Sequence, residues 1–179
     1  SSINQPAKLE LFNCSGESIR VIADRRTELF DDYELGTSEL LTIKTEDEYE
    51  LPAMWVLPPG FDKEKKYPVI FSVYGGPEYQ DVSNSFSAYL NRFFIAQSGI
   101  IYFKVDHRGS NHFGKSGVSQ MHRNLGKWEM HDYIEAVKWL REQPFVDESR
   151  IGIEGGSYGG YVAALGLTYG ADYFTHGIA

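Results

Sequence analysis

The stretch that decides the fold is Ile151-Gly152-Ile153-Glu154-Gly155-Gly156-Ser157-Tyr158-Gly159-Gly160-Tyr161. A short apolar run ends at a glycine, a serine follows two residues later, and another glycine follows two residues after the serine. This is the Gly-x-Ser-x-Gly spacing. The residues after Gly160 read as a helix to about Tyr169. The pattern therefore predicts a serine at the sharp turn between a buried strand and a helix.

A serine in this position is expected to be a nucleophile. The tip of the turn requires strained backbone angles, and Gly155 and Gly159 let strand and helix approach each other. The turn should point Oγ of Ser157 away from the sheet, over the helix N-terminus, where partial positive charge favours a developing oxyanion. The backbone N–H of Tyr158 is then one oxyanion donor. The alternative is a purely structural glycine-rich turn, which the strand and helix context makes the weaker interpretation.

Two phosphate-binding motifs are excluded at this turn. A Walker loop requires Lys-Ser or Lys-Thr after its second glycine, whereas Gly160 is followed by Tyr161 and Val162. The dinucleotide spacing Gly-x-Gly-x-x-Gly does not match either.

Strand and helix patterns alternate before the turn. Residues 69–74 and 100–105 are nearly continuous apolar runs, which are typical of strands buried on both faces of a parallel sheet. Between them, residues 86–97 form a predicted helix that ends at Gly99. The apolar residues at helical spacing in it are Tyr89, Leu90, Phe93 and Phe94.

A second unit contains the turn itself. Residues 128–141 form a predicted helix that leads into the strand 151–154, and residues 174–179 open another strand. Its apolar stripe consists of Ile134, Val137 and Leu140. The alternation predicts an α/β fold with a mostly parallel sheet and helices on both faces.

The N-terminal part reads as β-structure. Residues 8–12 and 18–23 alternate around a turn, residues 25–35 look like a connector, and residues 40–45 and 49–57 form a second hairpin. A lone strand pair such as the first would not be stable by itself.

Composition excludes several classes of protein. The 179 residues are 42% hydrophobic, enough for a core, and the net charge of −8 disfavours binding to nucleic acid. Cys14 is the single cysteine, and no histidine pair has metal-ligand spacing, so we expect no disulfide, metal or cofactor. Nowhere do about 18 apolar residues follow one another, so no membrane segment is predicted in this chain. The compartment stays open between periplasm and cytoplasm.

Tyr74-Gly75-Gly76-Pro77 follows the first buried strand and should lie on the same carboxyl edge of the sheet as Ser157. From the residues alone, Tyr74 is most simply an ordinary aromatic at the edge of the core. Asp106 and the His107-Arg108 pair end the next strand, and we expect structural loop roles for them. For Arg108 the alternative is a contact with substrate or with a β-propeller domain, and Asp106 is expected to anchor its own loop.

Four motifs in order resemble the prolyl oligopeptidase family of serine peptidases, with the dipeptidyl peptidase IV branch closest. They are Tyr74-Gly75-Gly76-Pro77, Asp106-His107-Arg108-Gly109-Ser110, Val146-Asp147-Glu148-Ser149-Arg150-Ile151 and Gly155-Gly156-Ser157-Tyr158-Gly159-Gly160-Tyr161. The resemblance implies an α/β-hydrolase fold with Ser157 as nucleophile and the Tyr74 hydroxyl and Tyr158 N–H as oxyanion donors. It also implies that the Tyr158 ring lines the pocket for the residue before the cut bond. Dipeptidyl peptidase IV proteins usually have Trp where this chain has Gly156, so the subfamily stays open.

The resemblance also implies a domain division. Residues 1–36 would be the end of a β-propeller and a connector, and residues 37–179 the N-terminal part of the catalytic domain, incomplete at its C-terminus. In α/β-hydrolases the acid and the histidine follow the nucleophile. His176 is the one histidine after Ser157, and we expect it to be a strand-start residue. The fragment should therefore be nearly inactive alone.

The implied function is removal of N-terminal dipeptides with Pro or Ala in the second position, through an acyl-enzyme on Ser157. Peptides would be the partner, and a homodimer of the full-length protein is compatible with the resemblance. An acylaminoacyl peptidase, another oligopeptidase or an esterase of the same fold is the alternative within enzymes. A non-catalytic fragment or pseudoenzyme is the alternative outside them.

Overall fold

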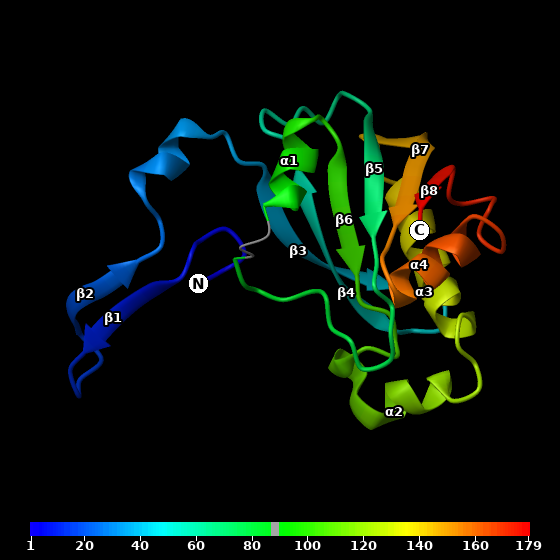
Figure 1. Cartoon of the computed structure of the whole chain (residues 1–179), viewed down its shortest axis with the longest axis horizontal. Helices are drawn as coiled ribbons and strands as arrows, with labels where there is room; N and C mark the ends of the chain where they lie inside the picture. The colour runs from blue at the N-terminus through cyan, green and yellow to red at the C-terminus, as the bar shows by residue number, and fades with distance from the viewer. Residues whose placement is uncertain (87–89) are drawn as a thin grey trace.

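The computed structural model describes residues 1–86 and 90–179 of the chain. Its centre is a six-stranded sheet in the order β3-β4-β6-β5-β7-β8 (Figure 1). The strands are β3 (Thr37–Lys44), β4 (Glu50–Leu57), β5 (Tyr67–Ser72), β6 (Ile101–Val105), β7 (Val146–Glu154) and β8 (His176–Ile178).

The direction of the strands confirms the predicted mostly parallel sheet. β5 pairs in parallel with both β6 and β7, and β7 pairs in parallel with β8. β4 runs antiparallel to both β3 and β6, so β4 alone points against the others. The carboxyl ends of β5, β6, β7 and β8 therefore share one edge of the sheet, where ligands bind in open α/β folds.

Helices cover both faces of the sheet, as predicted. They are α1 (Asn91–Gln97), α2 (Gly114–Val118), α3 (Lys127–Arg141) and α4 (Tyr158–Gly166), with short 3-10 turns η1 (Glu28–Asp32), η2 (Asn111–Phe113) and η3 (Ser119–Met121). Successive residues of β4 enter two different cores: Trp55 packs with α3 and α4 residues, and Met54 and Val56 pack with α1 residues. This alternation follows from the two-residue period of a strand.

The helix predicted over residues 86–97 is shorter in the structure. It begins at Asn91, and Phe86 lies outside it, while Tyr89 lies outside the described residues. Phe93 is buried, but Phe94 is 72% exposed and Leu90 is 56% exposed, so the predicted apolar stripe was wrong for these two residues. A helix of seven residues offers less than two full turns to the sheet, and here only one side of it reaches the core.

Helix α3 matches its predicted range to within one residue, but its buried stripe differs. Val137 and Leu140 are buried as expected, whereas Ile134 is only partly buried. Met130 and Tyr133 complete the buried side instead, at the three- and four-residue spacing of a helix face.

Both predicted N-terminal hairpins are present, and the first one stands apart. β1 (Lys8–Phe12) and β2 (Ser18–Asp24) form a separate two-stranded sheet. Figure 1 shows it at the left, away from the six-stranded sheet. Its exposed apolar residues are Leu9, Leu11, Phe12, Ile19, Val21 and Ile22. The residues before it are anchored, because Ile3 is buried and its N–H donates to Oδ1 of Asn84 at 2.8 Å.

Candidate active site

Ser157 lies at the tip of the turn between β7 and α4. β7 ends at Glu154 and α4 begins at Tyr158. The backbone of Ser157 has φ 58° and ψ −120°, a conformation that side-chain-bearing residues rarely adopt. Its carbonyl oxygen accepts the N–H of Gly160 at 3.0 Å, and the residue itself is exposed to solvent. A strained, exposed serine at a helix start is the geometry of a nucleophile elbow.

The glycines around the serine are required by close backbone contacts. A Cβ on Gly155 would lie 2.4 Å from the carbonyl oxygen of Gly159 and 2.7 Å from that of Val73. A Cβ on Gly159 would lie 2.3 Å from the same Val73 oxygen. A Cβ on Gly156 would meet no atom within 4 Å. The spacing of the motif thus reflects steric constraints at Gly155 and Gly159, whereas Gly156 is sterically free to vary.

Tyr74 lies directly beside this turn. It follows the end of β5, and its ring centroid is 6.1 Å from that of Tyr158 and 4.3 Å from that of Tyr79. Gly75, with φ 73°, turns the chain immediately after it, and a Cβ there would lie 2.9 Å from Oη of Tyr133. The fold therefore brings together the two residues predicted to donate to an oxyanion.

The Tyr158 side chain is held by a buried carboxylate that the sequence interpretation missed. Its hydroxyl donates to Oε1 of Glu129 at 2.6 Å. Glu129 is fully buried, and its Oε2 accepts the N–H of Gly126 at 2.9 Å. Burial, together with the hydrogen bond to Glu129, raises the pKa of Tyr158 above its usual range, so the phenol stays protonated. The available signal was a glutamate three residues after Gly126, a common helix-start spacing.

Asp106 anchors a loop rather than taking part in chemistry. Its carboxylate accepts the N–H groups of Asp81 and Val82 at 2.8 and 2.9 Å, and Nε2 of His112 lies 3.0 Å away. These bonds tie the end of β6 to the segment that follows the Tyr74 turn. Asp106 was expected to anchor its own loop, and the structure shows that it mainly anchors a neighbouring one.

Arg108 is a structural residue. Its side chain is 1% exposed and pairs with Asp132 at 2.6 Å and with Asp47 at 2.7 Å. The guanidinium also stacks between the rings of Tyr49 and Trp128, at 4.2 and 4.3 Å. Burial alone would lower the pKa of Arg108, but the two carboxylates raise it, so the group stays charged. The alternative of a substrate contact is contradicted, because the group is enclosed.

The histidines of the described chain serve other contacts. Nδ1 of His107 accepts the N–H of Gly109 at 3.0 Å, and burial lowers the pKa of this imidazole, which keeps it neutral. His131 contacts Arg108, and His176 opens β8 with Nδ1 2.8 Å from Oγ1 of Thr175. None of the hydrogen bonds among residues 1–86 and 90–179 joins a histidine to Ser157.

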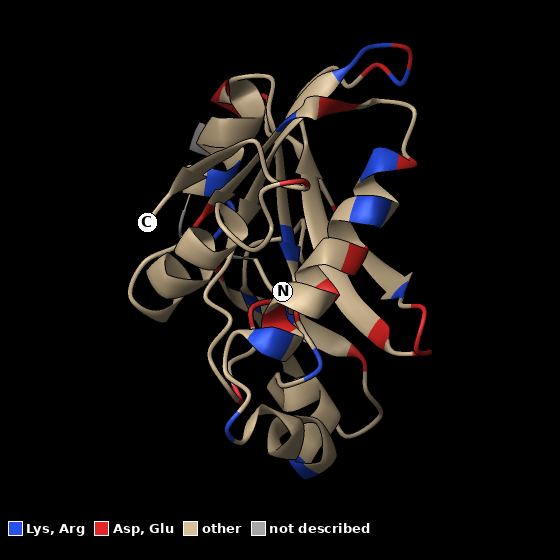
Figure 2. Cartoon of the chain, turned by 90° about the vertical axis from the view of Figure 1, so that its right-hand side faces the viewer, with Lys and Arg blue, Asp and Glu red and all other residues tan. Residues whose placement is uncertain are grey.

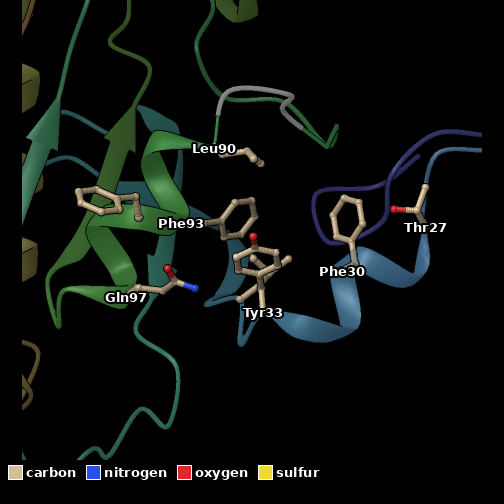
Figure 3. Close-up of a pocket in the computed structure, with 8 residues that line it drawn as sticks. Thr27, Phe30, Tyr33, Leu90, Phe93 and Gln97 are labelled. Carbon is tan, nitrogen blue, oxygen red and sulfur yellow. The ribbon is translucent and has the colours of Figure 1, made fainter.

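Two hollows differ in their relation to the turn. An open hollow of about 970 Å³ begins at Pro77 and Glu78, next to the Tyr74 turn, and extends to Leu125. A second hollow of about 320 Å³ lies between η1 and α1, on the face of the sheet opposite α4. Figure 3 shows Phe30 and Tyr33 on one side of it and Leu90 and Phe93 on the other. The second hollow is lined mainly by apolar side chains, and no carboxylate or imidazole lines it that could activate the hydroxyls of Thr27 and Tyr33, so it is not a candidate site for catalysis.

Neither surface charge nor metal ligands point to another kind of site among the described residues. On the side shown in Figure 2, Lys and Arg are interspersed with Asp and Glu instead of forming a basic face. In the described part of the chain no group of three His, Cys, Asp or Glu side chains is placed to hold a metal ion. No helix there combines the length and the apolar character needed to cross a bilayer.

Comparisons with known proteins agree on one group. The family model described as "Prolyl oligopeptidase family" matches residues 84–179. The chain is 37% identical over 165 residues to prolyl endopeptidase FAP of Bos taurus, covering 91% of the chain and 22% of that protein. It is 42% identical over 136 residues to a probable dipeptidyl-aminopeptidase B of Blastomyces gilchristii, covering 75% of the chain and 15% of that protein.

Two solved structures superpose on the whole chain. The crystal structure of Porphyromonas gingivalis dipeptidyl peptidase 4 matches with a TM-score of 0.87 and 34% identity, over 100% of this chain and 26% of that one. The structure of a putative dipeptidyl aminopeptidase IV from Bacteroides ovatus matches with a TM-score of 0.89 and 32% identity, over the same shares. The chain therefore spans about a quarter or less of the length of these relatives.

Proposed function

Because the chain belongs to the prolyl oligopeptidase family, we propose that it is the nucleophile-bearing part of a serine peptidase that acts through an acyl-enzyme on Ser157. The observation that carries this proposal is the φ of 58° at Ser157, at the break between β7 and α4, with the Tyr74 ring beside it. The α/β-hydrolase fold agrees with it, as the superposition on two dipeptidyl peptidase structures covers the whole chain.

The proposed chemistry is acyl transfer in two steps. Oγ of Ser157 attacks the carbonyl carbon of the peptide, and the Tyr74 hydroxyl and the Tyr158 N–H stabilise the oxyanion. The N–H of Tyr158 is available because the first N–H groups of a helix have no partner within it. The amine leaves with a proton, and water then hydrolyses the ester to release the acid and restore the serine.

We assign the base and its orienting acid to residues outside this chain. In this fold both follow the nucleophile in the sequence, and a serine hydroxyl without a base is a poor nucleophile. The isolated chain is therefore expected to show almost no turnover.

The substrates we propose are peptides whose N-terminal dipeptide ends in Pro or Ala. Support comes from relatives named as dipeptidyl-aminopeptidase B and dipeptidyl peptidase 4. Another relative is named as a prolyl endopeptidase, so an oligopeptidase is the second candidate. We further propose that residues 1–36 end a β-propeller, because the β1–β2 hairpin forms its own sheet with uncovered apolar side chains.

Labelling with a fluorophosphonate tests the nucleophile. The full-length protein should be labelled, Ser157→Ala should abolish labelling, and Ser149→Ala should retain it because Ser149 lies on an exposed part of β7. Absence of labelling that depends on Ser157 would favour the non-catalytic alternative. Reporters bearing Xaa-Pro, an acylated amino acid or a simple ester would then rank the enzyme candidates by kcat/KM.

A further inference from the structure

The first half of helix α3 lies against the Tyr158 side chain and against the glycine that follows Tyr74. Glu129, in its first turn, accepts the hydroxyl of Tyr158 at 2.6 Å. Tyr133, one turn later, lies so close to Gly75 that a Cβ on that glycine would be 2.9 Å from the phenol oxygen. Residues four apart share a helix face, so one side of α3 supports the serine turn and the Tyr74 turn together.

Glu129 can hold Tyr158 firmly because both of its oxygens are engaged and none of its surface is exposed. One oxygen accepts the Tyr158 hydroxyl and the other accepts the N–H of Gly126. A buried carboxylate is costly unless it is hydrogen-bonded, and bonds to a charged acceptor are stronger than neutral ones. The Tyr158 hydroxyl is therefore a required partner of this carboxylate.

The Tyr158 side chain is held at both ends. The backbone end is set by the strained turn at Ser157, and the hydroxyl end is set by Glu129. The rings of Tyr74 and Tyr161 flank it, with centroids 6.1 and 5.5 Å away. A tyrosine side chain has two main torsions, and a ring tethered in this way has little freedom in either. A rigid surface therefore stands next to the nucleophile.

We propose that Glu129 is a positioning residue that holds the Tyr158 ring as a rigid wall for the residue on the acyl side of the cut bond. This inference rests on the proposed function and deepens it. A fixed wall favours a compact acyl residue, because a larger one would have to displace a ring that cannot move without breaking the bond to the carboxylate.

The test compares Glu129→Gln, Tyr158→Phe and the double variant in the full-length protein. Glu129→Gln keeps an oxygen acceptor and the side-chain shape but removes the charge. We expect kcat/KM for an Xaa-Pro reporter to fall about tenfold in each single variant, because Tyr158→Phe removes the hydrogen bond to the charged acceptor and Glu129→Gln reduces it to a weaker neutral one. Preference for Pro over a bulkier acyl residue should fall too. The double variant should be little worse than either single one, because both single variants act on the same bond, one by removing it and the other by weakening it.

Glu135→Gln is the matched control. Glu135 lies further along α3, where it pairs with Lys138 and accepts the N–H of Glu46, away from Tyr158, so Glu135→Gln should leave kcat/KM and the acyl preference unchanged. Thermal unfolding of every variant separates loss of stability from loss of positioning. If the loss of activation free energy in the double variant equals the sum of the losses in the two single variants, the proposal is overturned. An unchanged preference for Pro in the single variants would overturn it too.

A second readout does not depend on turnover. With 3-fluorotyrosine incorporated, the ¹⁹F resonance of Tyr158, assigned by its absence in Tyr158→Phe, should shift or broaden in Glu129→Gln and not in Glu135→Gln. An unchanged resonance would overturn the tether. A resonance that changes in Glu129→Gln, in a protein that shows no Ser157-dependent labelling, would support the tether but overturn the proposed peptidase function. The two failures are therefore distinguishable.

Discussion

The turn at Ser157 and the β1–β2 hairpin are both strand-and-turn structures, but they are held in opposite ways. At the serine turn, backbone atoms just after β5, just after β7 and in α4 approach so closely that Gly155 and Gly159 have no room for a Cβ. In the hairpin, Ile19 is 59% exposed and Val21 is 48% exposed, and a Cβ on Gly16 would meet nothing within 4 Å.

The difference shows where this fold can store strain. Ser157 keeps an unfavourable backbone conformation because surrounding strands and helices leave it no alternative. The hairpin has only its own ladder, and that ladder has register shifts between Leu9 and Glu10 and between Leu11 and Phe12. A two-stranded ribbon of this kind is marginal by itself. A reactive serine therefore belongs in the first environment.

Substituting Gly159 should produce the largest effect in either region. In Gly159→Ala the new methyl would lie 2.3 Å from the Val73 oxygen, so β5 and α4 must separate. We expect loss of fluorophosphonate labelling and destabilisation of about 3 kcal/mol or more, the range of severe core overpacking. Urea unfolding of the full-length protein, together with labelling, measures both.

The matched control for this change is Gly156→Ala, at a position with open space around it. It should keep the labelling and change the unfolding free energy by less than about 0.5 kcal/mol, as surface substitutions usually do. Equal effects at Gly156 and Gly159 would contradict the steric explanation of the motif.

The turn could be predicted from the sequence because its requirements are local. Gly155, Ser157 and Gly159 lie within five residues, and the runs on either side identify a strand and a helix. The supporting residues could not be predicted in this way. Glu129 meets Tyr158, 29 positions away, only because α3 packs beside α4. Nothing in the periodicity of either helix determines that packing.

The same limit explains the errors at the surface. Spacing within residues 86–97 placed Leu90 and Phe94 among the apolar positions of a helix, but how far a helix of seven residues reaches over the sheet depends on the strands beneath it. Arg108 shows the same limit in the interior. Its position after a strand indicated a structural loop role, but not the partners Asp132 and Asp47, which neutralise it in the interior.

A prediction of intermediate size concerns the pH dependence of the unfolding free energy. Burial lowers the pKa of His107, so the unfolded chain binds a proton below about pH 6.5 while the folded chain does not. The contribution of His107 to stability is complete above its pKa in the unfolded chain. It is lost as the pH falls through its lower pKa in the folded chain. The loss is at most about 1.4 kcal/mol per pH unit in that window.

Unfolding in urea between pH 5 and pH 7.5 measures this slope. His107→Gln should flatten it, since the amide does not titrate. His122→Gln, which removes an exposed imidazole, is the control for the loss of a histidine. An identical slope in His107→Gln and the unsubstituted protein would show that His107 does not carry the effect.

The smallest effect is expected in the hairpin. Val21→Thr replaces one methyl by a hydroxyl at almost constant shape, and in the 179-residue chain Val21 is 48% exposed. The unfolding free energy of that chain should change by less than about 0.5 kcal/mol. In the full-length protein the same substitution should cost about 1 kcal/mol or more if a propeller covers the hairpin, since a buried hydroxyl without a partner is unfavourable. An equally small effect in both proteins would mean that the apolar face of β2 stays uncovered, and it would remove the main support for assigning residues 1–36 to a propeller.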